Sequence, residues 1–457
     1  SDYQRARGVL DQWMSWGGGS NAWAVSPRLS ATGQAMLASD PHVLAKVPST
    51  WYEVHLECPD LCLYGASLPG MPGIVIGHNT KVGWGITNSY VDTQDLVWER
   101  IEADQVLRPQ GLTAMVRREE VIRVKGRPDH LEVVWETPDG PLLFDDRQGT
   151  GISMRWAGWN VRDSTVRAWR NLLHCQSVQE AQQTLQGWQN PCLNFVLADS
   201  QGNIGYQLTG RVPIRRHSHG VLPQAGWQES GEWVGWVDPQ DLPSSFNPEC
   251  GYVVSANQAP RPLQDMPYLG VDFCDGYRAQ RIAQQLAPGG LTQAAFARLQ
   301  TDTISLAARV FVDLLRRDCG ADFARPDLLA ELLNWDGDLA AGSRPAAVYQ
   351  VLLLELTRQA YEPVLGKDLF LFWCGAPVST LGVLGGHAGR YVSFVLRAWE
   401  LQELPSAESP TWPQLLAQAW SESLKQLERL LGAEPAAWRW GALHGFQPGH
   451  PLAIVPW

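Results

Sequence analysis

The chain has 457 residues, 45% of them hydrophobic and 18% charged, and a formal net charge of −11 at pH 7. This composition is typical of a globular protein with a sizeable core. The acidic balance and the lack of any Lys or Arg run argue against a nucleic-acid partner, and no apolar run approaches the roughly 20 residues that a membrane-spanning helix needs.

The first unusual pattern is GGGSNAWAV, which runs from Gly17 to Val25. Three glycines precede a serine, and an apolar run typical of a strand follows it. Glycine permits backbone conformations in which the Ser20 hydroxyl can attack the Gly19 carbonyl and break the chain there. The new N-terminal amine, with a reference pKa of about 7.7–8.0, would then act as general base for its own serine. A plain flexible linker is the alternative interpretation.

The rest of the chain shows two successive patterns. Residues 20–276 alternate short apolar runs, such as LNFVLADS, with Gly, Pro and Asn turns, which predicts a mainly β portion. Residues 277–433 carry apolar side chains at spacings of three and four, as in ISLAARVFVDLLRR, which predicts a mainly helical portion. Residues 1–19 are interpreted as the end of a linker, and 434–457 as a truncated return towards the sheet system.

Eight cysteines are scattered along the chain, and none of their spacings is typical of a zinc site or a CxxC redox pair. Most are expected to be small core residues. Because a chain of this size does not need disulfides for stability, cysteine usage leaves the cellular compartment open.

Several motifs resemble, in order and spacing, the β-chain of the penicillin acylase family of N-terminal-nucleophile hydrolases. They are GGGSNAWAVSPRLSATGQAMLASDPHV, GWGITNSYVDTQDLVWER, NFVLADSQGNIGYQLTGRVPIR and GYVVSANQAP. The resemblance covers residues 20–457 and the glycines before them. It implies an α+β fold with four αββα layers, a precursor that cuts itself, and hydrolysis of an amide that joins an acyl group to an amine.

The resemblance also implies roles for individual residues. Ser20 matches the nucleophile, whose amine is the base. The backbone N–H of Asn88 and the side-chain amide of Asn257 match the two halves of an oxyanion hole, the pair of donors that stabilises the tetrahedral intermediate. An ordinary turn residue is the alternative for Asn257.

Two further positions match the active-site wall of the family. His42 falls where relatives carry Gln or His, and the alternative is a hydrogen-bonded histidine beside a turn. Arg278 matches an arginine near the serine amine, where it would lower the proton affinity of that amine. A surface arginine is the alternative, and Arg281, three residues further on, makes the match ambiguous.

A structural calcium ion is implied in the same way. Asp92, the carbonyl of Gln94 and Asp95 match a calcium-binding stretch, and oxygen ligands suit this hard cation. Relatives add a glutamate from another chain and a later aspartate, but here that later position falls closer to Tyr268, with Asp265 nearby. No organic cofactor is expected.

The resemblance implies a heterodimer with an α-chain cut from the same precursor, so this sequence is expected to be a portion of a longer product. A periplasmic or secreted location is implied as well. The substrate would be a small penicillin-type or other N-acyl compound. Four apolar positions suggest a pocket for an aromatic or aliphatic acyl group, although each is equally expected in the core: Leu68, Met71, Ile74 and Phe195.

Two other function classes stay open. The first is a serine hydrolase with a Ser-His-Asp arrangement, against which stands the lack of a GxSxG elbow after a strand. The second is a non-catalytic or unprocessed relative that retains the fold. In an uncut chain the Ser20 nitrogen belongs to an amide, which cannot act as a base.

Overall fold

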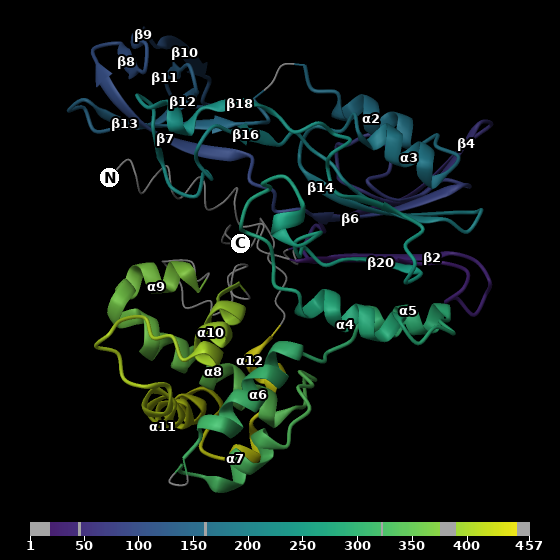
Figure 1. Cartoon of the computed structure of the whole chain (residues 1–457), viewed down its shortest axis with the longest axis vertical. Coiled ribbons are helices and arrows are strands. Elements are labelled where there is room, and N and C mark those ends of the chain that lie inside the picture. Colours follow the sequence, from purple (N-terminus) through teal and green to yellow (C-terminus); the bar gives the residue numbers. More distant parts are fainter. Residues whose placement is uncertain (1–18, 44–46, 160–161, 321–322, 375–389, 446–457) are drawn as a thin grey trace. The chain divides into compact units, whose positions relative to one another are not determined.

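The computed structural model describes residues 19–43, 47–159, 162–320, 323–374 and 390–445 (Figure 1). The chain forms two compact units. As far as these residues are described, unit 1 comprises Ser20–Asp40 and Glu53–Cys274, and unit 2 comprises Gly19, Pro41–Tyr52 and Asp275–Trp457. Residues 1–18 of the predicted linker, including Gly17, and the last residues of the predicted return, 446–457, lie outside the described part.

A seven-stranded sheet with the order β19-β15-β14-β6-β5-β4-β3 lies at the centre of unit 1. Its register pairs are antiparallel. The strands are β3 (Tyr52–Cys58), β4 (Leu61–Ser67), β5 (Ile76–His78), β6 (Val82–Asn88), β14 (Leu193–Asp199), β15 (Ile204–Leu208) and β19 (Ser244–Phe246).

Strand β14 shows why this sheet is covered on both faces. Successive side chains of a strand point to opposite faces, so a strand buried on both reads as one continuous apolar run. Phe195 and Leu197 belong to the core beneath the helices α2 (Thr165–Leu172) and α3 (Val178–Leu185). Val196 and Ala198 belong to a second core, which they share with residues of β1 and β20.

The second layer of strands is a three-stranded sheet with the order β2-β1-β20. Its strands are β1 (Ser20–Val25), β2 (Met36–Pro41) and β20 (Tyr252–Ser255). Figure 1 shows α2 and α3 on one side of β14 and β6, and β20 and β2 on the other. Unit 1 therefore has helix, sheet and sheet layers, and β1 is buried between its neighbours.

A separate eight-stranded sheet has the order β10-β11-β12-β13-β7-β8-β9, and β17 also pairs with β7. Alternate residues of β7 are buried and exposed, the pattern expected of a strand with one covered face. The strands are β7 (Gln94–Glu102), β8 (Gln105–Arg108), β9 (Gly111–Ala114), β10 (Val116–Ile122), β11 (His130–Thr137), β12 (Gly140–Asp145), β13 (Thr150–Trp156) and β17 (Gln224–Ala225). Strands β16 (Pro213–Arg215) and β18 (Trp233–Trp236) form a hairpin-like pair, and the short helices η1 (Glu229–Gly231) and η2 (Leu263–Asp265) lie in connections.

Unit 2 is helical. Its core contains a run of aromatic side chains, in which the ring of Phe311 lies 5.0 Å from that of Tyr349 and 5.4 Å from that of Trp399. The helices are α4 (Tyr277–Leu286), α5 (Gln293–Gln300), α6 (Leu306–Asp318), α7 (Pro326–Leu333), α8 (Arg344–Leu365), α9 (Lys367–Trp373), α10 (Arg390–Leu401), α11 (Trp412–Leu431), η3 (Pro435–Ala437) and α12 (Trp440–Leu443). In the described part of the chain, no helix is both long enough and apolar enough to cross a bilayer.

Candidate active site

Ser20 is the first residue of β1, the middle strand of the three-stranded sheet. It is buried, with 9% of its surface exposed, because β1 is covered by the seven-stranded sheet. The backbone nitrogen of Ser20 donates a hydrogen bond of 2.6 Å to Oδ1 of Asn257. The predicted nucleophile and the predicted side-chain donor are therefore in direct contact.

Asn257 follows β20 and is completely buried. Its φ of +67° lies in the left-handed region, which Asn tolerates better than most residues. Nδ2 of Asn257 donates to the backbone carbonyl of Asn88 at 2.8 Å. Rotating this amide by 180° would place an N–H against the N–H of Ser20 and an oxygen against an oxygen. The two neighbours therefore fix which end of the amide meets Ser20.

The register of β6 and β14 sets the direction of the backbone N–H of Asn88. Asn88 lies opposite Leu193 in the register of β6 and β14. The backbone of Leu193 bonds to Thr209, just after β15, and not to β6. Its nitrogen donates to Oγ1 of Thr209 at 3.4 Å, and its carbonyl accepts from the nitrogen of Thr209 at 2.9 Å. The N–H and carbonyl of one residue in a strand share a side, so the Asn88 N–H is directed away from β14.

A buried polar network supports this arrangement. Nδ2 of Asn194 donates to Oγ1 of Thr87 at 2.9 Å and to the carbonyl of Asn88 at 3.3 Å. The hydroxyl of Tyr206 donates to Oδ1 of Asn194 at 2.6 Å, and the hydroxyls of Thr87 and Ser255 lie 2.7 Å apart. Burial raises the pKa of the Tyr206 phenol, so this group stays a neutral donor.

Sequence reasoning identified Asn88 but missed the other members of this network, Asn194, Thr87, Tyr206 and Ser255. The signal that could have found Asn194 is a lone amide in the otherwise apolar run LNFVLA of β14. A polar side chain in a strand that is buried on both faces needs partners, which here are Thr87, Tyr206 and Asn88. Tyr206 carries no comparable signal, because a tyrosine in a buried strand is common.

The residue before Ser20 has its own contacts, within unit 2. The carbonyl of Gly19 accepts a hydrogen bond of 2.9 Å from the backbone N–H of His42. A Cβ on Gly19 would lie 2.7 Å from Nη2 and 2.9 Å from Cζ of Arg278, so the guanidinium would have to shift to admit a side chain. Arg281 instead pairs with Asp302, at 2.7 Å between Nη2 and Oδ2. Of the two arginines, Arg278 is the one beside Gly19.

The stretch that resembles a calcium site contains an internal cation. Nη2 of Arg215 lies 2.8 Å from Oδ1 of Asp95 and 3.1 Å from Oδ2 of Asp92. Asp265 is exposed on η2, and among the described residues no three His, Cys, Asp or Glu side chains are grouped to hold a metal ion. A guanidinium already contacts both predicted carboxylate ligands, an arrangement that does not fit a calcium ion at this position.

The four predicted acyl-pocket residues are not brought together around an opening. Ile74 and Phe195 are at most 1% exposed and belong to the core under α2 and α3, where Nε1 of Trp169 donates to the carbonyl of Ile74 at 2.8 Å. Leu68 is half-buried and Met71 is exposed. Ile74 and Phe195 therefore pack in this core, and a pocket formed by the four positions stays a prediction.

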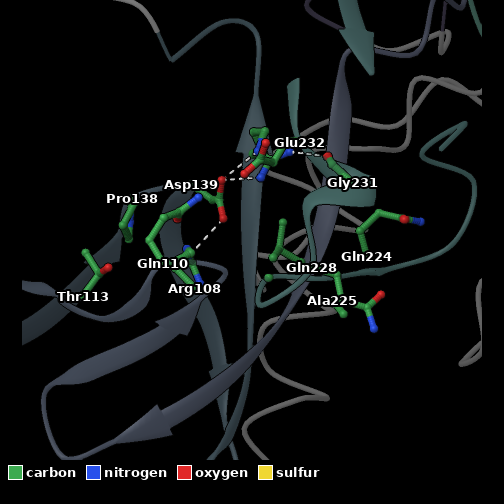
Figure 2. A pocket seen from close by; sticks show the side chains of 13 residues that line it. Arg108, Gln110, Thr113, Pro138, Asp139, Gln224, Ala225, Gln228, Gly231 and Glu232 are labelled. Atoms are coloured by element: carbon green, nitrogen blue, oxygen red, sulfur yellow. Dashed lines mark hydrogen bonds and ion pairs between the residues drawn. The ribbon is translucent and has the colours of Figure 1, made fainter. Parts of the chain in front are cut away.

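A cavity of about 280 Å³ lies in another part of unit 1 (Figure 2). Asp139 stands at its wall, where it accepts hydrogen bonds from Arg108 at 3.0 Å and from Nε of Arg155 at 2.8 Å. Arg108 also pairs with the fully buried Glu99 at 2.6 Å. These charges neutralise one another, and none of the predicted site residues lines the cavity.

Residues 2–457 match the model of a family described as penicillin amidase. The chain belongs to the penicillin amidase family.

Similar members of the penicillin amidase family come from Pseudomonas. The chain is 31% identical to the acyl-homoserine lactone acylase QuiP of Pseudomonas fluorescens strain Pf-5, over 98% of this chain and 57% of that protein. It is 32% identical to penicillin acylase 2 proenzyme of Pseudomonas sp. strain SE83, over 75% of this chain and 45% of that protein. The chain thus spans about half the length of the curated relatives it matches.

A solved structure supports the fold expected of a penicillin amidase. Thermostable penicillin G acylase from Alcaligenes faecalis superposes with a TM-score of 0.77, over 92% of this chain and 80% of that chain, at 22% sequence identity. The prediction of an α+β sandwich, made from the sequence motifs, is confirmed by this match and by the packed antiparallel sheets and helices.

Proposed function

We propose that this chain is the catalytic part of an amide hydrolase whose nucleophile is Ser20, released as an N-terminus when the Gly19–Ser20 bond is cut by the protein itself. The observation that carries the proposal is the hydrogen bond from the Ser20 nitrogen to Oδ1 of Asn257, at 2.6 Å in a buried position. After the cut, the same oxygen would hold one N–H of the new amine. The amine lone pair would then serve as base for the Ser20 hydroxyl.

The proposed self-cleavage begins at the Gly19 carbonyl. The Ser20 hydroxyl attacks this carbon, the Gly19 oxygen takes up negative charge, and the C–N bond breaks as the nitrogen gains a proton. Water then hydrolyses the ester and leaves a Gly19 carboxylate and a free Ser20 amine. The backbone N–H of His42, 2.9 Å from the Gly19 oxygen, is placed to stabilise the charge on that oxygen.

Amide hydrolysis would then use the same hydroxyl. Ser20 attacks the acyl carbonyl of the substrate while its amine takes the hydroxyl proton. The intermediate then collapses to an acyl-enzyme as this proton passes to the nitrogen of the leaving substrate amine. The backbone N–H of Asn88 and the side-chain amide of Asn257 are the proposed oxyanion donors, each contributing about 2.7–4 kcal/mol. Water then attacks the acyl-enzyme carbonyl. The Ser20 amine takes a proton from this water and passes it to the Ser20 oxygen, which releases the carboxylic acid.

The substrate proposed is a linear N-acyl compound. Relatives named as acyl-homoserine lactone acylase and penicillin acylase support an amide between an acyl group and a small amine. We further propose that the active form is a heterodimer with an α-chain from the same precursor, which is consistent with the proenzyme named among the relatives.

The experiment that tests the proposal follows processing and turnover separately in the full-length precursor. Intact mass and N-terminal sequencing should show a new chain that begins at Ser20, and a panel of phenylacetyl, glutaryl and long-chain acyl amides should reveal hydrolysis. Ser20→Ala should abolish both, whereas Ser26→Ala, one residue beyond the end of β1, should change neither. A freed Ser20 amine with no hydrolysis of any amide would instead indicate a non-catalytic relative.

A further inference from the structure

An arginine lies at the centre of the stretch that resembles a calcium site. We propose that the guanidinium of Arg215 takes the place of a calcium ion in this chain, so that this region folds without the metal. Nη2 of Arg215 lies 2.8 Å from Oδ1 of Asp95, 3.1 Å from Oδ2 of Asp92 and 3.3 Å from the carbonyl oxygen of Asp92. One nitrogen thus contacts three oxygens, from both acidic residues that were predicted to bind a cation.

The burial of these side chains explains why a cation is needed. The side chain of Asp95 is 0% exposed and that of Arg215 is 1% exposed. A carboxylate removed from water is strongly destabilising unless a positive group compensates it. The side chain of Asp92, with 17% of its surface exposed, retains some contact with solvent. A single guanidinium therefore suffices where relatives would use a doubly charged ion.

The oxygens of Asp95 are already fully engaged. Nε of Arg215 lies 3.1 Å from Oδ1 and 3.0 Å from Oδ2, and Nε1 of Trp233 donates to Oδ2 at 2.6 Å. Calcium needs six to eight oxygen ligands at about 2.3–2.6 Å. An ion at that distance from Asp95 would displace these donors and would lie against the positive guanidinium. The hydroxyl of Tyr268 is also engaged, because it donates to the carbonyl of His219 at 2.7 Å.

Neighbouring residues position Nε and Nη2 of Arg215, whereas its Nη1 is buried without a hydrogen-bond partner among the described residues. Arg215 and Trp233 are register partners on β16 and β18, so one strand pair delivers both donors to Asp95. Gly220, with a φ of +70°, packs against the ion pair, and a Cβ there would overlap Oδ1 of Asp95 and lie 2.6 Å from Nε of Arg215. The rings of Trp233 and Tyr268 each lie 5.8 Å from Cζ of Arg215, within the range of a cation–π interaction.

The first test compares the protein with and without calcium. Thermal unfolding of the full-length protein should give the same midpoint in EDTA and in millimolar calcium chloride. If the native state alone bound calcium, the added calcium would raise the midpoint. Terbium, a luminescent probe of calcium sites, should give no Trp-sensitised emission. A calcium-dependent rise in the midpoint that EDTA reverses, and that Asp95→Asn abolishes, would overturn the proposal.

The second test is a double-mutant cycle on the ion pair. Arg215→Ala should lower the unfolding midpoint by about 5 °C or more, because it leaves a buried carboxylate uncompensated. The control is Arg216→Ala, since Arg216 forms a surface pair with Glu232 and should matter little. Asp95→Asn should destabilise the parent protein but raise the midpoint of Arg215→Ala.

A calcium ligand would behave differently in this cycle, because its loss would lower the midpoint in both backgrounds. If Asp95→Asn lowers the midpoint of Arg215→Ala, or if Arg215→Ala is as mild as Arg216→Ala, the guanidinium is not the compensating cation. Should Arg215→Ala fail to fold, Arg215→Gln in the same cycle gives the same comparison, since Gln also removes the charge but fills more of the space.

Discussion

The side-chain oxygen of Asn257 lies 2.6 Å from the backbone nitrogen of Ser20 and accepts its hydrogen bond, although the two residues are 237 positions apart. They meet because β20 pairs with β1 and Asn257 follows β20 by two residues. The contact exists in the uncut chain. We therefore expect cleavage after Gly19 to convert this nitrogen from an amide into an amine without moving it.

Replacing Asn257 tests its place in the site. Asn257→Ala should lower kcat by about 10²–10³ with a smaller effect on KM, because an oxyanion donor acts mainly in the transition state. Asn257→Asp should be equally damaging, since a carboxylate cannot donate to the carbonyl of Asn88. Steady-state kinetics on the best amide of the panel measures both, with folding checked by circular dichroism. Turnover within tenfold of the parent enzyme would remove Asn257 from the oxyanion hole.

The network behind Asn257 is expected to contribute stability. Tyr206→Phe removes the donor to Oδ1 of Asn194 and leaves a buried acceptor without a partner, which should cost about 1–3 kcal/mol in the free energy of unfolding. Tyr252→Phe, in the half-buried strand β20, is the matched control and should change it by less than about 0.5 kcal/mol. Urea unfolding of both variants measures the difference. Equal losses in the two variants would mean that the hydrogen bond from Tyr206 to Asn194 contributes nothing measurable to the free energy of unfolding.

The contacts of Gly19 predict how the cut depends on this residue. Gly19→Ala should slow the appearance of the Ser20 N-terminus without unfolding the protein, because the added Cβ displaces the flexible end of Arg278 and not a rigid group. His42→Ala should process normally, since its backbone N–H remains available to the Gly19 carbonyl. Intact mass measured over time distinguishes the variants. A Gly19→Ala precursor that matures at the parent rate would contradict this account.

Gly77 is expected to be irreplaceable in the seven-stranded sheet. It has a φ of +157° and faces Gly65 across the β4–β5 pair, and a Cβ there would overlap the carbonyl oxygen of Tyr64. Gly77→Ala should therefore cost about 3 kcal/mol or more. Gly83→Ala, in the adjacent strand β6, adds a Cβ at ordinary contact distances of 3.7 Å and beyond and should be far milder. Denaturant unfolding compares the two, and similar losses would contradict the steric argument.

Cys192 provides a prediction about pH. Burial raises the pKa of its thiol to about 12, so the native protein keeps this proton where the unfolded chain, with a pKa of about 8.5, releases it. The contribution of Cys192 to stability should be complete below about pH 8.5 and be lost as the pH rises towards 12. Unfolding midpoints measured across this range should fall less steeply in Cys192→Ala than in the parent protein.

Thiol labelling checks the same point directly. At pH 8 an alkylating reagent should modify the exposed Cys58 and Cys250 in the native protein, and should reach Cys192 only after unfolding. Peptide mass mapping identifies the modified sites, and Cys250→Ala serves as control for the pH series. Rapid native labelling of Cys192 would show that this thiol is neither buried nor protonated as described.

The sequence determined the features that are encoded locally. Three patterns in the sequence are short-range: the glycines before Ser20, the alternation of strands and turns, and the helical spacing after residue 277. The first follows from the backbone freedom of glycine, and the other two follow from the periodicity of buried and exposed side chains. Together with the ordered motifs, they identified the family and the α+β fold. They also brought Ser20, Asn88 and Asn257 into one hypothesis, which the geometry around Asn257 supports.

Only the tertiary structure decided which groups meet across the fold. Arg215 is 120 positions from Asp95, and the register of β16 and β18 brings it there. Asn194 and Tyr206 become a polar network, and Phe195 becomes a core residue, because β14 is buried between two layers. Charge compensation and burial depend on neighbours far away in sequence, so the acidic stretch alone could not show that a guanidinium lies beside it.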